Sequence, residues 1–222
     1  MALSSLADDY GFLMVAPNGT PSSGDGNPQF WDASDACCSW EDPALDDSAY
    51  LSGLIAAVKA KYRIDDKRVY ILGHSNGALM SYRLAHDHSG TIAAIASLAG
   101  ADANESEAPP RPVHVLQIHG TGDEAIAYGG GEIRGSAYPG ARQSAENWAA
   151  HNGCSATGSF VGMLDLVETL PGMDATITRY NSGCKPGGSA ELWTITDGAH
   201  IPELSAPFTR LVVEWLLGHP KP

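Results

Sequence analysis

The chain has 222 residues, 43% hydrophobic and 18% charged, a composition typical of a folded globular domain rather than a disordered chain. Its formal net charge of -13 argues against nucleic acids and anionic membranes as partners, because both are bound through clustered lysine and arginine. No apolar run approaches the roughly 20 residues that cross a bilayer, and the first residues lack the basic and apolar regions of a signal peptide. The length suits one domain, residues 1–222, and the chain is expected to be cytosolic, mature or cut from a longer protein.

Apolar runs alternate with amphipathic stretches along the chain. A short helix is expected at residues 2–10, followed by a buried strand at FLMVAP, residues 12–17. Residues 18–43 are rich in Gly, Pro, Ser and Asp and lack periodicity, which predicts a long loop of the kind that often carries function. Further strands are expected at residues 68–73, 91–100, 113–120, 174–180 and 190–196, and further helices at 46–62, 76–90, 140–151 and 207–219. This alternation predicts an α/β fold with a mostly parallel sheet flanked by helices.

The stretch ILGHSNGALM places Ser75 between Gly73 and Gly77, where a predicted buried strand gives way to a helix. A serine hydroxyl becomes an effective nucleophile when it is exposed, close to a base and close to N–H donors that stabilise an oxyanion. A sharp strand-to-helix turn meets these needs, and glycines on either side leave room for it. The alternative is a glycine-rich turn with a surface serine, but the strand–turn–helix context favours a nucleophile elbow.

A base and an orienting acid should follow the serine, in the order Ser, Asp or Glu, His. Asp123 lies just after the strand expected at residues 113–120, and His200 lies in the loop after the last strand. Asp197 is the rival acid, although it is only three residues from His200 and therefore too close in sequence to be the usual orienting residue. The remaining histidines are expected to be structural or solvent-facing: His74, His86, His88, His114, His119, His151 and His219.

One stretch, Gly120-Thr121-Gly122-Asp123-Glu124-Ala125, also matches the G-x-G-x-x-A pattern of dinucleotide-binding proteins. That pattern must open a helix, whereas here a glycine-rich loop follows. Nucleotide binding is therefore not expected, and the sequence predicts no cofactor.

The four cysteines are Cys37, Cys38, Cys154 and Cys184, and they contain no C-x-x-C pair, so a zinc site or other metal site is not expected. We interpret Cys154 and Cys184, which flank predicted strand structure, as a disulfide; the alternative is two buried thiols. Cys37 and Cys38 could form a bond between adjacent residues or stay free. Two bridges would indicate an oxidising compartment.

Seven stretches carry a family resemblance: YGFLMVAPNG, WDASDACCSW, LDDSAYLSGLI, RVYILGHSNGALMSYRLA, HGTGDEAIAYGGG, NWAAHNGC and ELWTITDGAH. Over nearly its whole length the chain resembles the polyhydroxybutyrate depolymerase and feruloyl esterase group of α/β-hydrolases. The resemblance implies a secreted or periplasmic carboxylesterase with Ser75, Asp123 and His200 as its triad, and it supports the pairing of Cys154 with Cys184. Such enzymes cleave feruloyl or acetyl groups from plant polysaccharides, hydroxyalkanoate polyesters or small acyl esters.

The chain departs from this family at its start. In the family a further strand precedes the first helix and ends in an H-G-x-x-G turn, whose backbone supplies one oxyanion donor. We therefore expect an α/β-hydrolase fold that lacks its N-terminal strands, unless the chain is a fragment or a partner chain fills the gap. The Asn76 N–H would be one donor, and an N–H from residues 18–20, which include Thr20, would replace the other. The alternative function is a weakly active or inactive hydrolase-like interaction module.

Two tryptophans, Trp31 and Trp40, lie in the long loop that the resemblance places near the acyl site. An exposed aromatic ring would suit a feruloyl ring or an ester chain. For Trp31 substrate contact and packing of the loop are equally expected, and for Trp40 packing is favoured. No segment reads as a lid, so we expect an open site that prefers short acyl groups.

Overall fold

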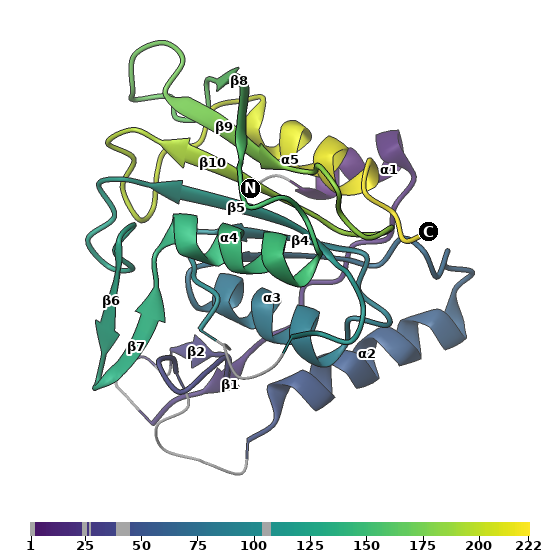
Figure 1. The fold of residues 1–222 in the computed structure, drawn as a ribbon. Helices are drawn as coiled ribbons and strands as arrows, with labels where there is room; N and C mark the ends of the chain where they lie inside the picture. The colour runs from purple at the N-terminus through teal and green to yellow at the C-terminus, as the bar shows by residue number, and fades with distance from the viewer. Residues whose placement is uncertain (1–2, 24–25, 27, 39–44, 104–107) are drawn as a thin grey trace.

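The structure is a computed structural model that describes residues 3–23, 26, 28–38, 45–103 and 108–222. Within these residues, the central sheet has six strands (Figure 1). Their order is β3 (Tyr70–His74), β4 (Ala94–Leu98), β5 (His114–Gly120), β10 (Ser189–Ile195), β9 (Ala175–Tyr180) and β8 (Ser159–Leu164). The first four strands are parallel to one another. β9 is antiparallel to its neighbour β10, and β8 is antiparallel to β9. The α/β architecture with a mostly parallel sheet is therefore confirmed.

Helices cover both faces of this sheet. The helices are α1 (Ala7–Tyr10), preceded by the 3-10 turn η1 (Leu3–Leu6), α2 (Asp47–Lys61), α3 (Asn76–Asp87), α4 (Ala141–His151) and α5 (Phe208–Leu217). Leu98 of β4 packs with Val212 of α5 on one face, and Ile95 of β4 packs with Tyr82 of α3 and Trp148 of α4 on the other. Side chains of this one buried strand thus pack into the apolar cores on both faces of the sheet, because successive side chains of a strand point to opposite faces. In the described part of the chain, no helix is long and apolar enough to span a membrane.

Several short strands were not expected from the sequence. They are β1 (Thr20–Pro21), β2 (Gln29–Phe30), β6 (Gly130–Ile133), β7 (Ser136–Pro139) and the edge strand β8. In β8, Phe160 is 66% exposed and the register shifts between Phe160 and Gly162. Most residues of these short strands are exposed or half-buried, so the strands depend mainly on backbone pairing near the surface.

The strand expected at residues 12–17 does not form, so this prediction was wrong. The apolar side chains of Leu13, Met14 and Val15 are 44–46% exposed. A strand needs a neighbour that accepts and donates its backbone hydrogen bonds, and apolar character alone does not supply one.

Contacts of the chain on either side of residues 12–17 show where the two ends of this segment lie relative to β3. At its start, Tyr10 Oη donates to Glu214 Oε1 of α5 at 2.5 Å, and Arg68, just before β3, donates to Leu217 O at the end of the same helix. At its other end, Gly19 packs on the backbone of Phe30, which precedes the loop that touches the carboxyl end of β3. The chain just before the segment therefore contacts α5, and the chain just after it contacts the loop that reaches the end of β3.

β3 itself is the edge strand on this side of the sheet. All five of its residues are only half-buried, whereas all five residues of β4 are buried. Since both faces of β3 show this exposure, its cause is the missing neighbour at the edge rather than an uncovered face. In the described residues no strand that precedes β3 joins the sheet, as expected for a fold that lacks its N-terminal strands.

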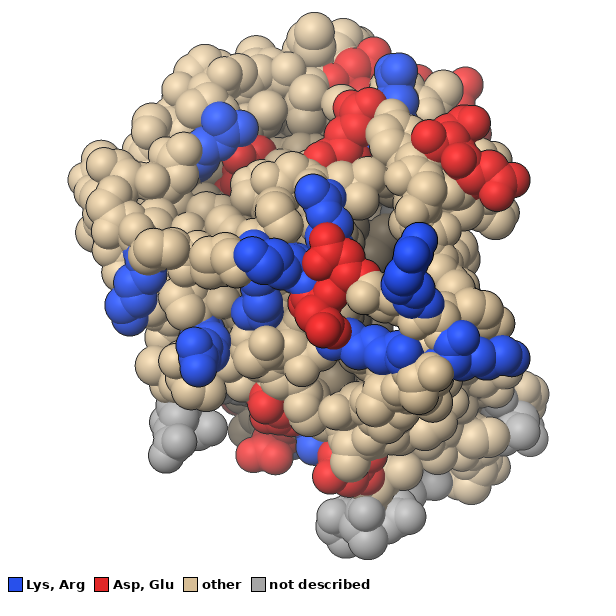
Figure 2. Space-filling view, turned by 90° about the vertical axis from the view of Figure 1, so that its right-hand side faces the viewer, with Lys and Arg blue, Asp and Glu red and all other residues tan. Residues whose placement is uncertain are grey.

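One face of the molecule carries several Lys and Arg side chains, with Asp and Glu side chains among them (Figure 2). Figure 2 shows Lys and Arg side chains gathered on the face that lies to the right in Figure 1, and the surface between them is hollowed. Five of the 13 basic residues lie within residues 59–68, at the end of α2 and before β3. Lys59 pairs with Asp66 at 2.8 Å and Arg68 with Asp65 at 3.5 Å, and exposed pairs of this kind add little stability.

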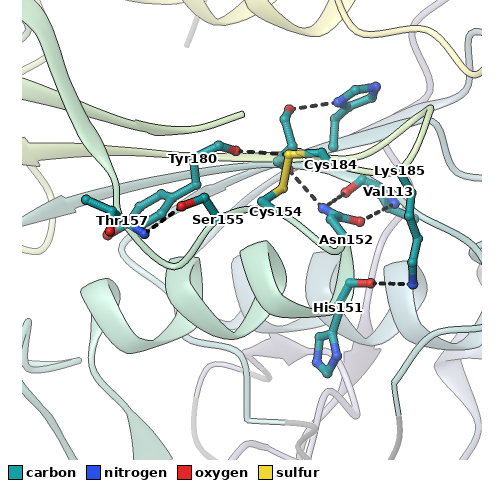
Figure 3. Close-up of a disulfide and its surroundings, with 11 residues drawn as sticks. Val113, His151, Asn152, Cys154, Ser155, Thr157, Tyr180, Cys184 and Lys185 are labelled. Carbon is teal, nitrogen blue, oxygen red and sulfur yellow. Dashed lines mark hydrogen bonds between the residues drawn. A yellow bond between two sulfur atoms is a disulfide. The ribbon is translucent and has the colours of Figure 1, made fainter. Parts of the chain in front are cut away.

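Cys154 and Cys184 form the expected disulfide, which is confirmed. It joins the chain just after α4 to the connection between β9 and β10 (Figure 3). Beside it, the buried Asn152 side chain donates to Val113 O at 2.8 Å and to Ser189 O at 3.0 Å. The disulfide and this amide together fix the end of α4 to the amino ends of β5 and β10.

Replacing both Cys154 and Cys184 with serine should lower the free energy of unfolding by roughly 3–4 kcal/mol in the chain-entropy model. The reason is that the bond joins residues 30 apart in sequence and so restricts the unfolded chain. Urea unfolding of the parent protein and the double variant measures the difference. A loss below about 1 kcal/mol would show that the unfolded chain gains little freedom from the missing bond.

His114, at the start of β5, lies in a half-buried basic cluster. Its Nδ1 lies 2.8 Å from Ser189 Oγ, and its ring lies 4.8 Å from that of His219. Burial, with the nearby charges of His219 and Lys221, lowers the pKa of His114 to about 4. The folded protein therefore resists protonation at a position where the unfolded chain accepts a proton.

This difference predicts loss of stability in acid. Because the folded pKa of His114 is depressed, its contribution is complete above about pH 6.5 and is lost as the pH falls toward 4. The loss should reach about 2–3 kcal/mol at pH 4.5. His114→Asn, which keeps a polar atom near Ser189, should remove that part of the pH dependence when urea unfolding is compared at pH 7 and pH 4.5. Equal acid losses in both proteins would assign the effect to other groups.

Candidate active site

Ser75 stands at the turn between β3 and α3. Its φ of 56° lies in the left-handed region that few non-glycine residues adopt, and its N–H donates to Leu98 O at 2.9 Å. A Cβ at Gly73 would lie 2.0 Å from Gly77 O, so only glycine fits there. A Cβ at Gly77 would meet the Trp31 ring at 3.9 Å, an ordinary contact. Space therefore requires the first glycine of the pattern but not the second.

The structure brings Ser75, His200 and Asp123 into one chain of hydrogen bonds. His200 Nε2 lies 2.8 Å from Ser75 Oγ, and His200 Nδ1 lies 2.8 Å from Asp123 Oδ2. The other carboxylate oxygen, Oδ1, accepts from the N–H groups of Ala125 and Ile126, both at 2.9 Å. The carboxylate is thus fixed by the backbone on one oxygen and faces the histidine with the other.

The Asp123 carboxyl group is held in its charged form. Burial acts to raise the pKa of Asp123, but hydrogen bonds from His119, His200 and the N–H groups of Ile126 and Ala125 outweigh it and hold that pKa well below its usual range. A carboxylate that stays ionised can keep the Nδ1 proton of a neighbouring histidine in place.

The loops that carry Asp123 and His200 pack against each other through glycines. A Cβ at Gly120 would lie 2.0 Å from Gly198 O, and Gly122 N–H donates to that same oxygen at 3.0 Å. The glycines of the G-x-G-x-x-A match therefore allow two backbones to approach closely.

Asp197, the rival acid, does not take the place of Asp123 beside His200. It is exposed, and its own N–H donates to Thr121 Oγ1 at 2.8 Å. In the structure, His200 Nδ1 contacts Asp123 Oδ2 instead.

Two further histidines contact this hydrogen-bond chain, and both were expected to be structural or solvent-facing. His74 Nε2 donates to His200 O at 2.8 Å, because a carbonyl oxygen can only accept. His119 Nε2 lies 3.1 Å from Asp123 Oδ2. For His119 the sequence carried a signal: Gln117 and His119 are polar residues at alternate positions of an apolar strand, so both point to one side.

Asn76 links the elbow to the long loop. Its side chain accepts from Trp31 N at 2.6 Å and donates to Trp31 O at 2.9 Å, and it also donates to the sulfurs of Cys37 and Cys38 at 3.3 Å. In the structure these two sulfurs are bonded to each other. Since the Asn76 side chain is occupied in this way, its backbone N–H at the start of α3 is the group left to meet a ligand.

Of the other residues singled out in the sequence, Thr20 lies in β1 and its Oγ1 donates to Asp47 Oδ1 at 3.4 Å. The Trp31 ring is stacked with Tyr50 at 6.5 Å between centroids. Trp40 lies outside the described residues.

Solved structures of esterases share this fold. An acetyl xylan esterase from Aspergillus awamori matches with a TM-score of 0.61 at 15% identity, over 96% of this chain and 80% of that chain. The esterase PE8 matches with a TM-score of 0.58 at 17% identity, over 98% of this chain and 84% of that chain. At these identities the likeness establishes the fold, which is that of the α/β-hydrolases.

Sequence relatives narrow this class to a family. A bifunctional acetylxylan esterase/xylanase of Neocallimastix patriciarum is 32% identical over 124 residues, 56% of this chain and 16% of that protein. Feruloyl esterase B of Piromyces equi is 28% identical over 182 residues, 78% of this chain and 31% of that protein. The chain thus spans less than a third of the length of either relative. Residues 1–145 match the esterase PHB depolymerase family, and the chain belongs to this family of carboxylic ester hydrolases.

Proposed function

We propose that the chain is a serine carboxylesterase in which Ser75 is the nucleophile, His200 the general base and Asp123 the residue that orients the base. The observation that carries this proposal is the continuous hydrogen-bond chain from Ser75 Oγ through both ring nitrogens of His200 to Asp123, with 2.8 Å at each step. Its geometry is that of a base ready to remove the serine proton.

In this mechanism His200 Nε2 takes the proton as Ser75 Oγ attacks the ester carbonyl, and Asp123 keeps the other ring proton on Nδ1. The histidine then gives its proton to the leaving alcohol, which produces an acyl-enzyme. Water, activated by the same Nε2, attacks the acyl group and restores Ser75. Acylation and deacylation each begin with neutral His200 accepting a proton, so activity should fall in acid as this residue is protonated.

The negative oxygen of the tetrahedral intermediate needs two N–H donors, and Asn76 offers one. We propose an N–H from residues 18–20 as the second. In support, Thr20 pairs with Phe30 in the β1–β2 ladder. Trp31, which follows Phe30, is hydrogen-bonded through its backbone to the side chain of Asn76. The loop that contains Thr20 is therefore connected to the elbow through consecutive contacts.

A structure of the protein with a phosphonate on Ser75 tests this second donor. We expect an N–H of residues 18–20 within about 3 Å of the phosphonyl oxygen, the distance that such donors require. A single contact, from Asn76 alone, would favour the competing function instead.

That competing function is a weakly active hydrolase-like interaction module, and the unpaired outer edge of β3 favours it. A missing donor costs about 10²–10³-fold in rate. The two functions therefore differ in kcat on a good substrate by a margin that is easily measured.

As substrates we propose short acyl esters, feruloyl or acetyl esters of plant polysaccharides, or polyester ester bonds. The relatives named as feruloyl and acetylxylan esterases support this range. Trp31 lies beside the elbow and would offer an aromatic surface to a feruloyl ring. The disulfide supports secretion or a periplasmic location, because such bonds persist in oxidising compartments.

The experiment that tests the function is hydrolysis of p-nitrophenyl esters of increasing chain length, together with methyl ferulate, acetylated xylan and a polyester film. We expect turnover that is highest for the shortest acyl chains, unaffected by chelators and absent after phosphonate treatment. If turnover on every substrate is below about 10⁻³ of that usual for esterases, the interaction module is favoured over the esterase as the function.

A further inference from the structure

Asp123 contacts a second histidine besides His200. His119 Nε2 lies 3.1 Å from Asp123 Oδ2, the oxygen that His200 Nδ1 approaches to 2.8 Å. The side chains of His119 and Asp123 are both fully buried. His119 Nε2 also lies 2.8 Å from Ile126 O. One carboxylate oxygen therefore serves two imidazole rings, one on the side of Ser75 and one in the interior.

The hydrogen-bond network indicates which ring nitrogen of His119 carries the proton of the neutral ring. Gln117 Nε2 lies 2.7 Å from Gly100 O, which can only accept, so this atom is the amide nitrogen. Its oxygen then accepts from Tyr82 Oη at 2.7 Å. The same amide nitrogen lies 3.1 Å from His119 Nδ1 and can only donate, so Nδ1 carries no proton. The proton of a neutral His119 is consequently on Nε2, and this N–H is shared between Ile126 O at 2.8 Å and Asp123 Oδ2 at 3.1 Å.

Tyr82 and Gln117 are themselves fully buried, so bulk water does not replace their hydrogen bonds and thereby allow the other tautomer of His119. Burial also raises the pKa of Tyr82 well above its usual value, which keeps its hydroxyl a donor. A second proton on His119 Nδ1 would face the Gln117 amide N–H and lose its acceptor.

From this network, and resting on the proposed function, we propose that His119 is a positioning residue that tunes the catalytic acid. As a neutral donor locked by Gln117 and Tyr82, it shares the oxygen of Asp123 with His200. The shared oxygen has less negative charge to give to a protonated His200. His119 thus keeps His200 in its neutral, base-competent form at a lower pH than a carboxylate without this donor would allow.

Other titratable groups surround this cluster and must be held constant in a test. His74, from β3, has its ring 5.1 Å from that of His200, and Tyr128 has its ring 5.7 Å from that of His119. Tyr138 Oη accepts from Ala127 N beside the acid turn. Glu124 follows the acid in sequence, and the negative charge of Asp102 acts on Tyr82. All of them remain in variants of His119, so a difference between variants reports on the His119 donor.

Two variants separate the donor from mere packing. His119→Met fills a similar volume and has no donor, whereas His119→Gln can place an amide N–H near the position of Nε2. In His119→Met the acid limb of the kcat/KM profile should move to higher pH by about half a unit or more, because charged hydrogen bonds are worth more than one pKa unit. His119→Gln should return the midpoint toward that of the parent protein. His151→Gln, at the end of α4, is the matched control and should not move it.

A measurement without turnover distinguishes failure of this inference from failure of the proposed function. In the Ser75→Ala background, NMR titration of the His200 ring should show the same upward shift of its midpoint when Met replaces His119. An unchanged midpoint in folded His119→Met protein would overturn the role of His119, whether or not the chain hydrolyses esters. Conversely, loss of the esterase proposal would leave this NMR shift intact.

The parent protein supplies a test that requires no substitution at His119. Nitrogen-15 NMR should find His119 neutral at pH 7 with its proton on Nε2. A proton on Nδ1, or a charged ring at pH 7, would overturn the inference even if His119→Met fails to fold.

Discussion

Replacing Ser75 with alanine should reduce kcat for ester hydrolysis by about 10⁵–10⁶-fold, the scale seen when a triad nucleophile is lost. The substitution removes the atom that attacks the ester, and the base has no other hydroxyl at 2.8 Å in its place. Alanine and serine experience similar strain at a φ of 56°, so the turn itself should persist. The thermal midpoint should therefore stay within a few degrees of the parent value. Initial rates on p-nitrophenyl acetate and a thermal melt measure both quantities.

Ser52→Ala in α2 is the matched control, because it makes the same chemical change in a helix that carries no residue of the triad. Its kcat should equal that of the parent protein. Substantial turnover by folded Ser75→Ala would exclude the proposed nucleophile, and the esterase activity would then have to reside elsewhere in the fold.

The edge of the sheet at which Ser75, Asp123 and His200 meet could be predicted from the sequence. Each residue follows an apolar run that reads as a strand, and β3, β5 and β10 are parallel. Parallel strands end at one edge of a sheet, so the residues after them gather there. Asp123 was preferred to Asp197 because Asp197 lies only three residues from His200, and in the structure it is Asp123 that contacts His200 Nδ1.

The failures of sequence reasoning have a common physical cause, which is that pairing partners cannot be read from local composition. FLMVAP is as apolar as a buried strand, yet Leu13 and Met14 are half exposed because no neighbouring strand covers them. His119 was expected to be structural or solvent-facing, and its contact with Asp123 depends on how the turn between the two residues folds. The attachment of Trp31 to Asn76 joins residues 45 apart in sequence, within a loop that has no periodic pattern.

Replacing Asp123 with asparagine should lower kcat by about 10⁴-fold, the effect of this change in the well-studied serine protease triad. The structure gives a specific reason. Oδ1 of Asp123 accepts from the N–H groups of Ala125 and Ile126, so the asparagine oxygen must occupy that position. Its NH2 group then replaces Oδ2 and donates to His200 Nδ1. The histidine is forced into the tautomer with its proton on Nε2, which faces Ser75 and can no longer accept the serine proton.

Asp197→Asn makes the same chemical change at the rival acid and is the matched control. Because the Asp197 backbone is held by Thr121 and its side chain is exposed, kcat should change by less than about threefold. NMR of the His200 ring nitrogens should show the proton on Nδ1 in the parent protein and in Asp197→Asn, and on Nε2 in Asp123→Asn. The reverse pattern, with a large loss of kcat only in Asp197→Asn, would assign the orienting role to Asp197. A large loss in Asp123→Asn without the change of tautomer would instead mean that the negative charge of Asp123, rather than its hold on the ring, is what the reaction requires.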